Sequence, residues 1–139
     1  MRVDILDQCP FDLSLKANQV VYEYLKRYSA HPDLVEILFR ALNVCGDVQV
    51  FSPDISKCCF VTLSTQRIIF GFAIGTNTIA FMLSEKMKAI ALQTGAKPCP
   101  ECGTDWVELP MFRGDWPRVD LEFWMLKACL NVRESVGLA

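Results

Sequence analysis

The stretch that decides the fold is residues 57–83, KCCFVTLSTQRIIFGFAIGTNTIAFML. It contains three segments rich in β-branched and aromatic residues, which favour strands. These segments are 57–63, 66–74 and 78–83. Ser64-Thr65 and Gly75-Thr76-Asn77 separate them like tight turns. Parallel strands need long crossover connections, so these short links predict an antiparallel meander.

Helical patterns flank this stretch on both sides. Before it, apolar residues recur at helical spacing over residues 13–29 and again over 32–44. After it, Ser84 is placed to cap a helix that Gly95 ends. Pro117 opens a last helix, which runs to about residue 135.

The order of these elements predicts a single α+β domain over residues 1–139. The expected sheet is an antiparallel β-meander of about five strands, which includes one strand from residue 47 and one over 105–109. We expect two N-terminal helices, one helix before the last strand and a long C-terminal helix, all packed on one face of the sheet.

Composition narrows the class of partner. Hydrophobic residues make up 52% of the chain, slightly above the ordinary range. An apolar subunit interface is the simplest use of such an excess, so we expect a homodimer, and a protein partner fits the same surface. The formal net charge of −2 and the scattered Lys and Arg residues argue against nucleic acid as a partner. The most apolar part of the chain, residues 58–83, is interrupted by polar residues well before it reaches the roughly 20 apolar residues that a membrane span needs. No membrane partner is therefore expected.

The seven cysteines are odd in number and irregularly spaced, and residues 1–4 do not resemble a signal peptide. We therefore expect a cytoplasmic protein without a disulfide framework. In that compartment a cysteine is ordinarily a small buried apolar residue. This interpretation applies to Cys45, Cys58, Cys59 and Cys129, which have apolar neighbours in the sequence.

The run KPCPECG, residues 97–103, has the spacing of half a zinc knuckle. Two residues between Cys99 and Cys102 let both thiolates face one ion, and Gly103 can take the positive φ that such turns need. A structural zinc site needs four ligands, so two are missing.

The missing zinc ligands have several possible sources. Within the chain they are Cys9, the Cys58-Cys59 pair and His31. Alternatively, Cys99 and Cys102 of two subunits complete a four-cysteine site on a two-fold axis. A third interpretation is a proline-stiffened loop whose thiols bind no metal.

Sequence patterns that indicate a catalytic site are weaker than the pattern of the half zinc knuckle. A thioredoxin-type pair lies at a helix start after a strand, whereas Cys99 and Cys102 follow a helix and precede a strand. His31, the only histidine, fits a helix boundary better than a general base. No phosphate loop, dinucleotide fingerprint or nucleophile elbow is present in the sequence. We therefore predict neither catalytic nor cofactor-binding residues.

Aromatic residues concentrate in the last third of the chain. Trp106 and Trp124 are expected in the core, where the final strand meets the final helix. Phe112, Arg113 and Trp116 share a loop and form a candidate partner or ligand surface.

Three runs carry a resemblance to a known family: IAFMLSEKMKAIALQTGA, TDWVELP and LEFWMLKACLNV. Their order, a strand entering a helix, then a Trp strand, then a closing helix, resembles the small MmcQ/YjbR-like proteins and the TfoX N-terminal domains. The resemblance covers roughly residues 48–132. It implies a compact α/β domain without an established catalytic site, sometimes suspected of binding DNA, and it supplies no functional residues.

The sequence thus predicts a non-enzymatic binding or interaction module with a possible zinc knuckle at Cys99 and Cys102. Its working surface is expected where the loop of Cys99 and Cys102 meets the loop over 111–116. The alternatives are a nucleic-acid-associated regulator of the YjbR/TfoX type and a small enzyme that uses the loop of Cys99 and Cys102.

Overall fold

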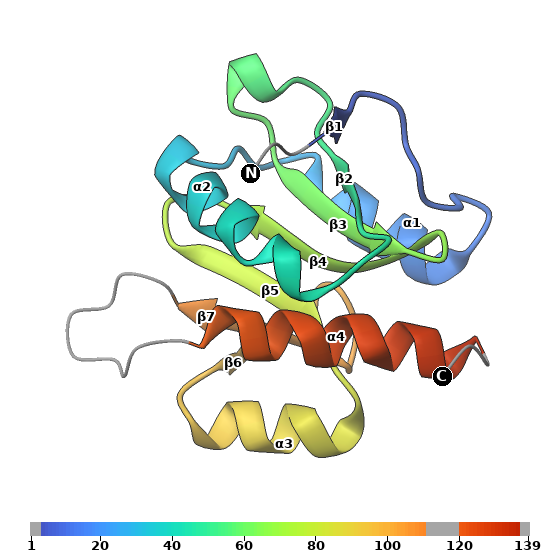
Figure 1. Ribbon diagram of the computed structural model, residues 1–139, viewed down its shortest axis with the longest axis vertical. Coiled ribbons are helices and arrows are strands. Elements are labelled where there is room, and N and C mark those ends of the chain that lie inside the picture. Colours follow the sequence, from blue (N-terminus) through green and yellow to red (C-terminus); the bar gives the residue numbers. More distant parts are fainter. Residues whose placement is uncertain (1–3, 111–119, 137–139) are drawn as a thin grey trace.

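Seven strands form one sheet in the order β1-β2-β3-β4-β5-β7-β6 (Figure 1). The computed structural model describes residues 4–110, except for the side chain of Pro110, and residues 120–136. The strands are β1 (Ile5–Leu6), β2 (Gln49–Phe51), β3 (Val61–Thr65), β4 (Ile68–Ile74), β5 (Thr78–Met82), β6 (Lys97–Pro98) and β7 (Trp106–Pro110). The expected α+β class is confirmed. The two strands beyond the expected five, β1 and β6, have two residues each, too few to show a sequence period.

Antiparallel pairing joins β2 through β5 in chain order and then β5 to β7, as a meander requires. Among the described strands, only β1 pairs in parallel, with β2 as its neighbour. Gly71 of β4 faces Phe81 of β5, and a Cβ at Gly71 would lie 2.9 Å from the Phe81 ring. Glycine is therefore required there by close packing between neighbouring strands.

The turn between β3 and β4 lies two residues later than the sequence predicts. Ser64 and Thr65 belong to β3, while Gln66 and Arg67 both take a positive φ, at 52° and 64°. Buried Asn18 holds this turn: its Nδ2 donates to the Arg67 carbonyl at 2.9 Å, and its Oδ1 accepts from the Ile69 amide at 3.0 Å. A distant side chain thus stabilises a turn whose own residues do not favour it.

Four α-helices and two 3₁₀ turns complete the described chain. They are α1 (Lys16–Leu25), α2 (Pro32–Arg40), η1 (Leu42–Val44), η2 (Ile55–Lys57), α3 (Glu85–Gln93) and α4 (Leu121–Ser135). Ser84 caps α3 as predicted, because its Oγ accepts from the Met87 amide. Helix α4 begins after Asp120, which accepts from the Phe123 amide, and the predicted start at Pro117 lies outside the described residues. None of these helices is long and apolar enough to cross a membrane.

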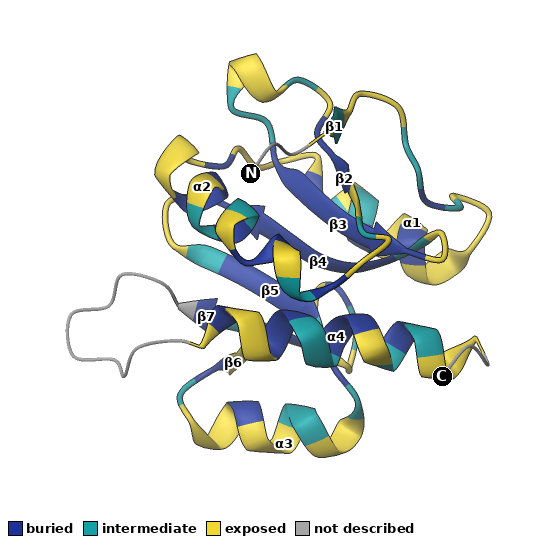
Figure 2. Cartoon of the chain, in the orientation of Figure 1, coloured by how far each residue is buried: buried dark blue, intermediate teal, exposed yellow. Residues whose placement is uncertain are grey.

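Helices cover both faces of the sheet, where the sequence predicts one. Helices α2 and α4 lie on the face turned to the viewer in Figure 1, here the front face, and α1 lies behind, on the back face. The physical reason is the burial of all five residues of β3 and all but the first of β4 (Figure 2). A strand buried on both sides needs two layers of cover.

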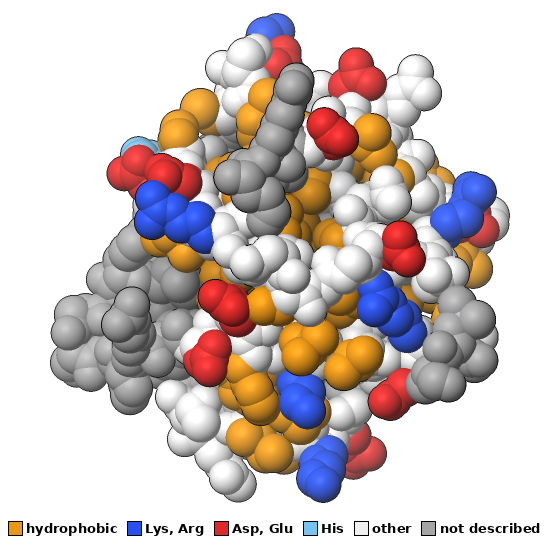
Figure 3. All heavy atoms as spheres, in the orientation of Figure 1, with side chains coloured by type: hydrophobic (Ala, Val, Ile, Leu, Met, Phe, Trp, Pro, Cys, Tyr) orange, Lys and Arg blue, Asp and Glu red, His pale blue; other side chains and the backbone are white. Residues whose placement is uncertain are grey.

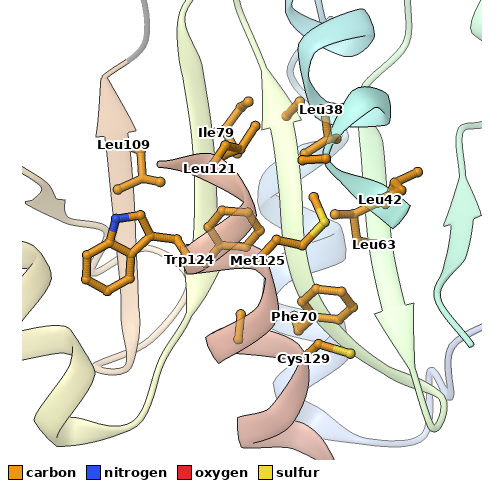
Figure 4. Close-up of a cluster of buried hydrophobic side chains, with 14 of the residues drawn as sticks. Leu38, Leu42, Leu63, Phe70, Ile79, Leu109, Leu121, Trp124, Met125 and Cys129 are labelled. Atoms are coloured by element: carbon orange, nitrogen blue, oxygen red, sulfur yellow. The ribbon is translucent and has the colours of Figure 1, made fainter. Parts of the chain in front are cut away.

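Each face has its own core. The front core is mainly aliphatic and includes Leu38 of α2, Leu63 and Phe70 of the sheet, and Met125 of α4 (Figure 4). The back core is rich in rings, with Phe51, Phe60, Phe72 and Trp106 among its members. Trp106 and Trp124 are buried, as expected, but in different cores.

A disulfide joins Cys45, directly after η1, to Cys129 in α4, across 84 residues of sequence. This corrects the expectation that these two buried cysteines are unpaired apolar residues. Cys58 and Cys59, expected to be buried as well, are only partly buried. Nothing in the local sequence indicates the pairing, since it joins two segments that only the tertiary fold brings together.

Candidate functional site

The KPCPECG run forms a tight turn that brings the Cys99 and Cys102 sulfur atoms to 3.6 Å. The Cys102 amide donates to the Cys99 carbonyl at 3.1 Å, and the Cys99 amide donates to the Trp106 carbonyl at 3.0 Å. Gly103 takes a φ of 139°, the positive value expected from the sequence. The two sulfur atoms lie close together, as the spacing predicts, while metal binding by the pair stays a prediction.

Both thiols lie inside the back core. Cys99 is fully buried and Cys102 is 5% exposed. The hydrogen bond with Cys99, together with burial and the carboxylates of Glu101 and Glu108, raises the pKa of Cys102 well above its usual range. Because a thiolate is the nucleophilic form and the raised pKa keeps the thiolate fraction of Cys102 small, the turn is poorly suited to fast nucleophilic catalysis.

None of the other zinc ligands suggested by the sequence joins Cys99 and Cys102 in a ligand cluster within the described residues. His31 caps α2, accepting from the Asp33 amide, and Cys58 and Cys59 follow η2. Cys9 packs on the outer part of the back core. Across residues 4–110 and 120–136, no three His, Cys, Asp or Glu side chains form a group that could hold a metal ion. Burial of both sulfur atoms also disfavours a site shared across a two-fold axis, because such a site needs them at the surface.

Phe112, Arg113 and Trp116, the predicted partner surface, lie outside the described residues.

A cavity of about 250 Å³ lies between α2 and η2. We call it the α2 cavity. Its lining is Ala30, Pro32, Val35, Glu36, Phe39, Ile55 and Cys58. Val35 and Phe39 are four residues apart on α2 and so share one side of the helix. Five of the seven lining residues are apolar, with one carboxylate and one thiol among them.

Backbone contacts between distant segments build this cavity. The Ala30 amide donates to the Cys58 carbonyl at 2.8 Å, while the His31 amide donates to the Gly75 carbonyl at 2.9 Å. The start of α2 is thereby fixed beside η2. Cys58 takes a left-handed conformation, with φ 56°, and turns the chain from η2 back toward β3. On the opposite wall Ile55 is 40% exposed.

The charge at the cavity rim is largely compensated. Glu36 accepts a hydrogen bond from the Arg40 guanidinium at 2.6 Å, one helical turn away. The Cys58 sulfur has no hydrogen-bond partner in the described part of the chain. The cavity therefore offers mainly apolar contact.

Sequence reasoning missed the α2 cavity, because its walls come from residues 30–39 and 55–58. The His31-Pro32 boundary and the turn near Asp54 were both recognisable. No sequence pattern indicated that they lie against each other.

The chain matches no family model, no curated protein and no solved structure. The resemblance to the YjbR and TfoX proteins stays a prediction. A functional proposal therefore depends on the geometry of the site.

Proposed function

We propose that this protein is a non-enzymatic binding module whose α2 cavity takes a small apolar molecule of one or two aromatic rings. The observation that carries the proposal is the cavity itself, with apolar residues on both walls. Small-molecule sites are typically concave and mostly apolar, with few polar groups.

Size supports this class of ligand. An engineered apolar cavity of about 150 Å³ is large enough for benzene, and the α2 cavity measures about 250 Å³. Burial of about 150 Å² of ring surface contributes about 4 kcal/mol. Association opposes part of this, so we expect a dissociation constant of about 1 mM or above for a single ring.

The lining also supports binding over catalysis. Its ionisable groups are Glu36 and Cys58. A nucleophilic thiol needs an adjacent base, and Glu36 is held by Arg40. Nothing in the described lining activates Cys58 in this way.

The experiment uses Cys58 as a reporter inside the cavity. The native protein is alkylated with a small maleimide at increasing indole concentrations, and peptide mass spectrometry follows the rates at Cys58 and Cys59 separately. We expect indole to slow alkylation of Cys58 several-fold and to leave Cys59, which is absent from the lining, unchanged.

Ile55→Trp provides the matched test, since the larger side chain covers the cavity from its exposed wall. It should abolish the effect of indole, whereas Leu130→Trp, on an equally exposed position of α4, should not. Equal rates at Cys58 with and without indole would contradict the proposal.

The finer predictions from sequence remain open to test. Hydrophobic side chains gather over α4 and α3 in Figure 3, and Phe123 and Leu130 of α4 are partly exposed, which supports a homodimer. A cytoplasmic location, the zinc knuckle and a nucleic-acid-associated role of the YjbR/TfoX type stay predictions.

A further inference from the structure

The contact between the Cys99 and Cys102 sulfur atoms is suited to a reaction that involves neither zinc nor the α2 cavity. Five cysteines of the described chain are free: Cys9, Cys58, Cys59, Cys99 and Cys102. Only Cys99 and Cys102 lie within sulfur–sulfur contact of each other, at 3.6 Å. We propose that they are a reversible oxidation site, which closes into a second disulfide when a small-molecule disulfide is the oxidant.

The backbone of the turn already has the right span. The hydrogen bond from the Cys102 amide to the Cys99 carbonyl defines a four-residue β-turn. Such a turn brings its first and last Cα atoms within about 7 Å, and disulfides bridge Cα atoms about 4.4–6.8 Å apart. The sulfur atoms must approach by about 1.5 Å to reach bonding distance. Side-chain torsions supply a movement of that size, so the sheet pairing of β6 and β7 is kept.

The surroundings of Cys99 and Cys102 favour a bond between these two sulfur atoms over a bond from either of them to another cysteine of the described chain. The back core packs Phe72 and Trp106 around the pair, with the two rings 5.2 Å apart. Cys9 is partly buried at the edge of the same core. The nearest charged oxygen is Glu101 Oε1, 3.9 Å from the Cys99 sulfur. Among residues 4–110 and 120–136 no third ligand joins the two sulfur atoms, so the pair is suited to bond formation between them.

The oxidation proceeds as two thiol–disulfide exchanges. Cys102, the less buried of the two residues, loses its proton, and the small thiolate fraction attacks one sulfur of the small disulfide R–S–S–R. A Cys102–S–S–R bond forms, the S–S bond of the reagent breaks, and RS⁻ leaves. Cys99 then loses its proton and attacks the Cys102 sulfur, releasing the second RS⁻. The two protons finish on the two RS⁻ groups, so two protein thiols and R–S–S–R give one protein disulfide and two RSH.

Burial and acidic neighbours set the rate of this reaction. Both disfavour the Cys102 thiolate, because Glu101 and Glu108 add negative charge beside this buried residue. We therefore expect oxidation at least tenfold slower than that of an exposed thiol such as free cysteine. A small reagent should also react faster than a bulky one.

The experiment uses the full chain in redox buffers of cystamine and cysteamine. Aliquots are quenched in acid, denatured and labelled with N-ethylmaleimide, and intact and peptide masses are measured. Cys9, Cys58 and Cys59 are only partly buried and should gain cysteamine adducts first, so the peptide masses decide. On the peptide that holds Cys99 and Cys102, we expect progressive loss of both labels without a cysteamine adduct, and their return on reduction. The joined pair of Cys45 and Cys129 serves as an internal reference for a disulfide already formed.

Two variants make the result specific. Cys99→Ser should leave Cys102 as a thiol or as a mixed disulfide with cysteamine, with no internal bond. Cys58→Ser, the matched control, should retain the two-label loss. Labelling of both Cys99 and Cys102 under every oxidising buffer would overturn the proposal. Protection of both thiols that a zinc chelator removes would also overturn it, because it would establish a metal site.

Discussion

The two faces of the sheet are closed in different ways. On the front, the 15-residue α4 and the nine-residue α2 cover an aliphatic core, and a disulfide fixes α4 to the segment after α2. On the back, the ten-residue α1, the segment before it and the turn of Cys99 and Cys102 cover a core of rings, and the two sulfur atoms there are unjoined. The front is covalently closed, whereas the back relies on packing and hydrogen bonds. The back is therefore the face on which oxidation can add a bond.

Phe70 and Phe72 of β4 give the sharpest test of this contrast, since both are fully buried and they point to opposite faces. Each Phe→Ala change should lower the free energy of unfolding by about 3–5 kcal/mol, through lost burial and the cavity left behind. Chemical denaturation measures both.

Phe→Leu changes then separate rings from apolar volume. Phe72 lies 5.2 Å from the Trp106 ring and 6.3 Å from the Tyr24 ring, while Phe70 has no ring neighbour among the described residues. Aromatic pairs contribute about 0.5–1.5 kcal/mol beyond burial. Phe72→Leu should therefore cost about 1–2 kcal/mol more than Phe70→Leu. Equal costs would mean that the ring content of the back core adds nothing to its stability.

The disulfide gives the next largest effect. Replacing Cys45 and Cys129 together by alanine should lower the free energy of unfolding by about 2–4 kcal/mol, because the bond closes a long loop in the unfolded chain. Reductant should destabilise the wild-type protein by a similar amount and leave the double variant unchanged. A double variant that stays sensitive to reductant would contradict this assignment. Closing the four-residue loop between Cys99 and Cys102 should contribute less, at most about 2 kcal/mol by the same chain-entropy relation.

The sequence predicted the features that local residues determine. The central strands, the Ser84 cap and the proximity of Cys99 to Cys102 each depend on a few adjacent residues, and each is confirmed. The second helical layer was also recognisable in principle. The run IIFGFAI of β4 lacks the alternation of a half-exposed strand, which is typical of a strand buried on both faces.

The features that were missed depend on distant contacts. The β3–β4 turn falls at Gln66 and Arg67 because Asn18, far away in the chain, supplies hydrogen bonds to it. The bond between Cys45 and Cys129 and the walls of the α2 cavity likewise join segments that the sequence separates. No local propensity encodes such pairings, so only the assembled fold reveals them.

The smallest expected effect comes from comparing one Asp-x-Ser motif that occurs on each face. Asp12-Leu13-Ser14 precedes α1, and Asp54-Ile55-Ser56 contains Ile55 of the α2 cavity lining. In both motifs the Asp Oδ1 accepts hydrogen bonds from the amide and the hydroxyl of the Ser two residues later. These bonds, the hydroxyl bond foremost, hold the pKa of Asp12 and of Asp54 below the ordinary value of 3.8.

A lowered carboxyl pKa in the folded state means that each motif stabilises the fold above about pH 4. That contribution is lost as the pH falls through the folded-state value, because protonation removes the charge that the hydrogen bonds favour. Carboxyl NMR titration should find both Asp residues below 3.8. Ser14→Ala should raise the pKa of Asp12 alone, and Ser56→Ala that of Asp54 alone. Because Asp54 directly precedes Ile55 of the cavity lining, indole should shift the Asp54 titration and leave Asp12 unchanged. A shift at both residues would place the ligand elsewhere and separate this motif from the α2 cavity.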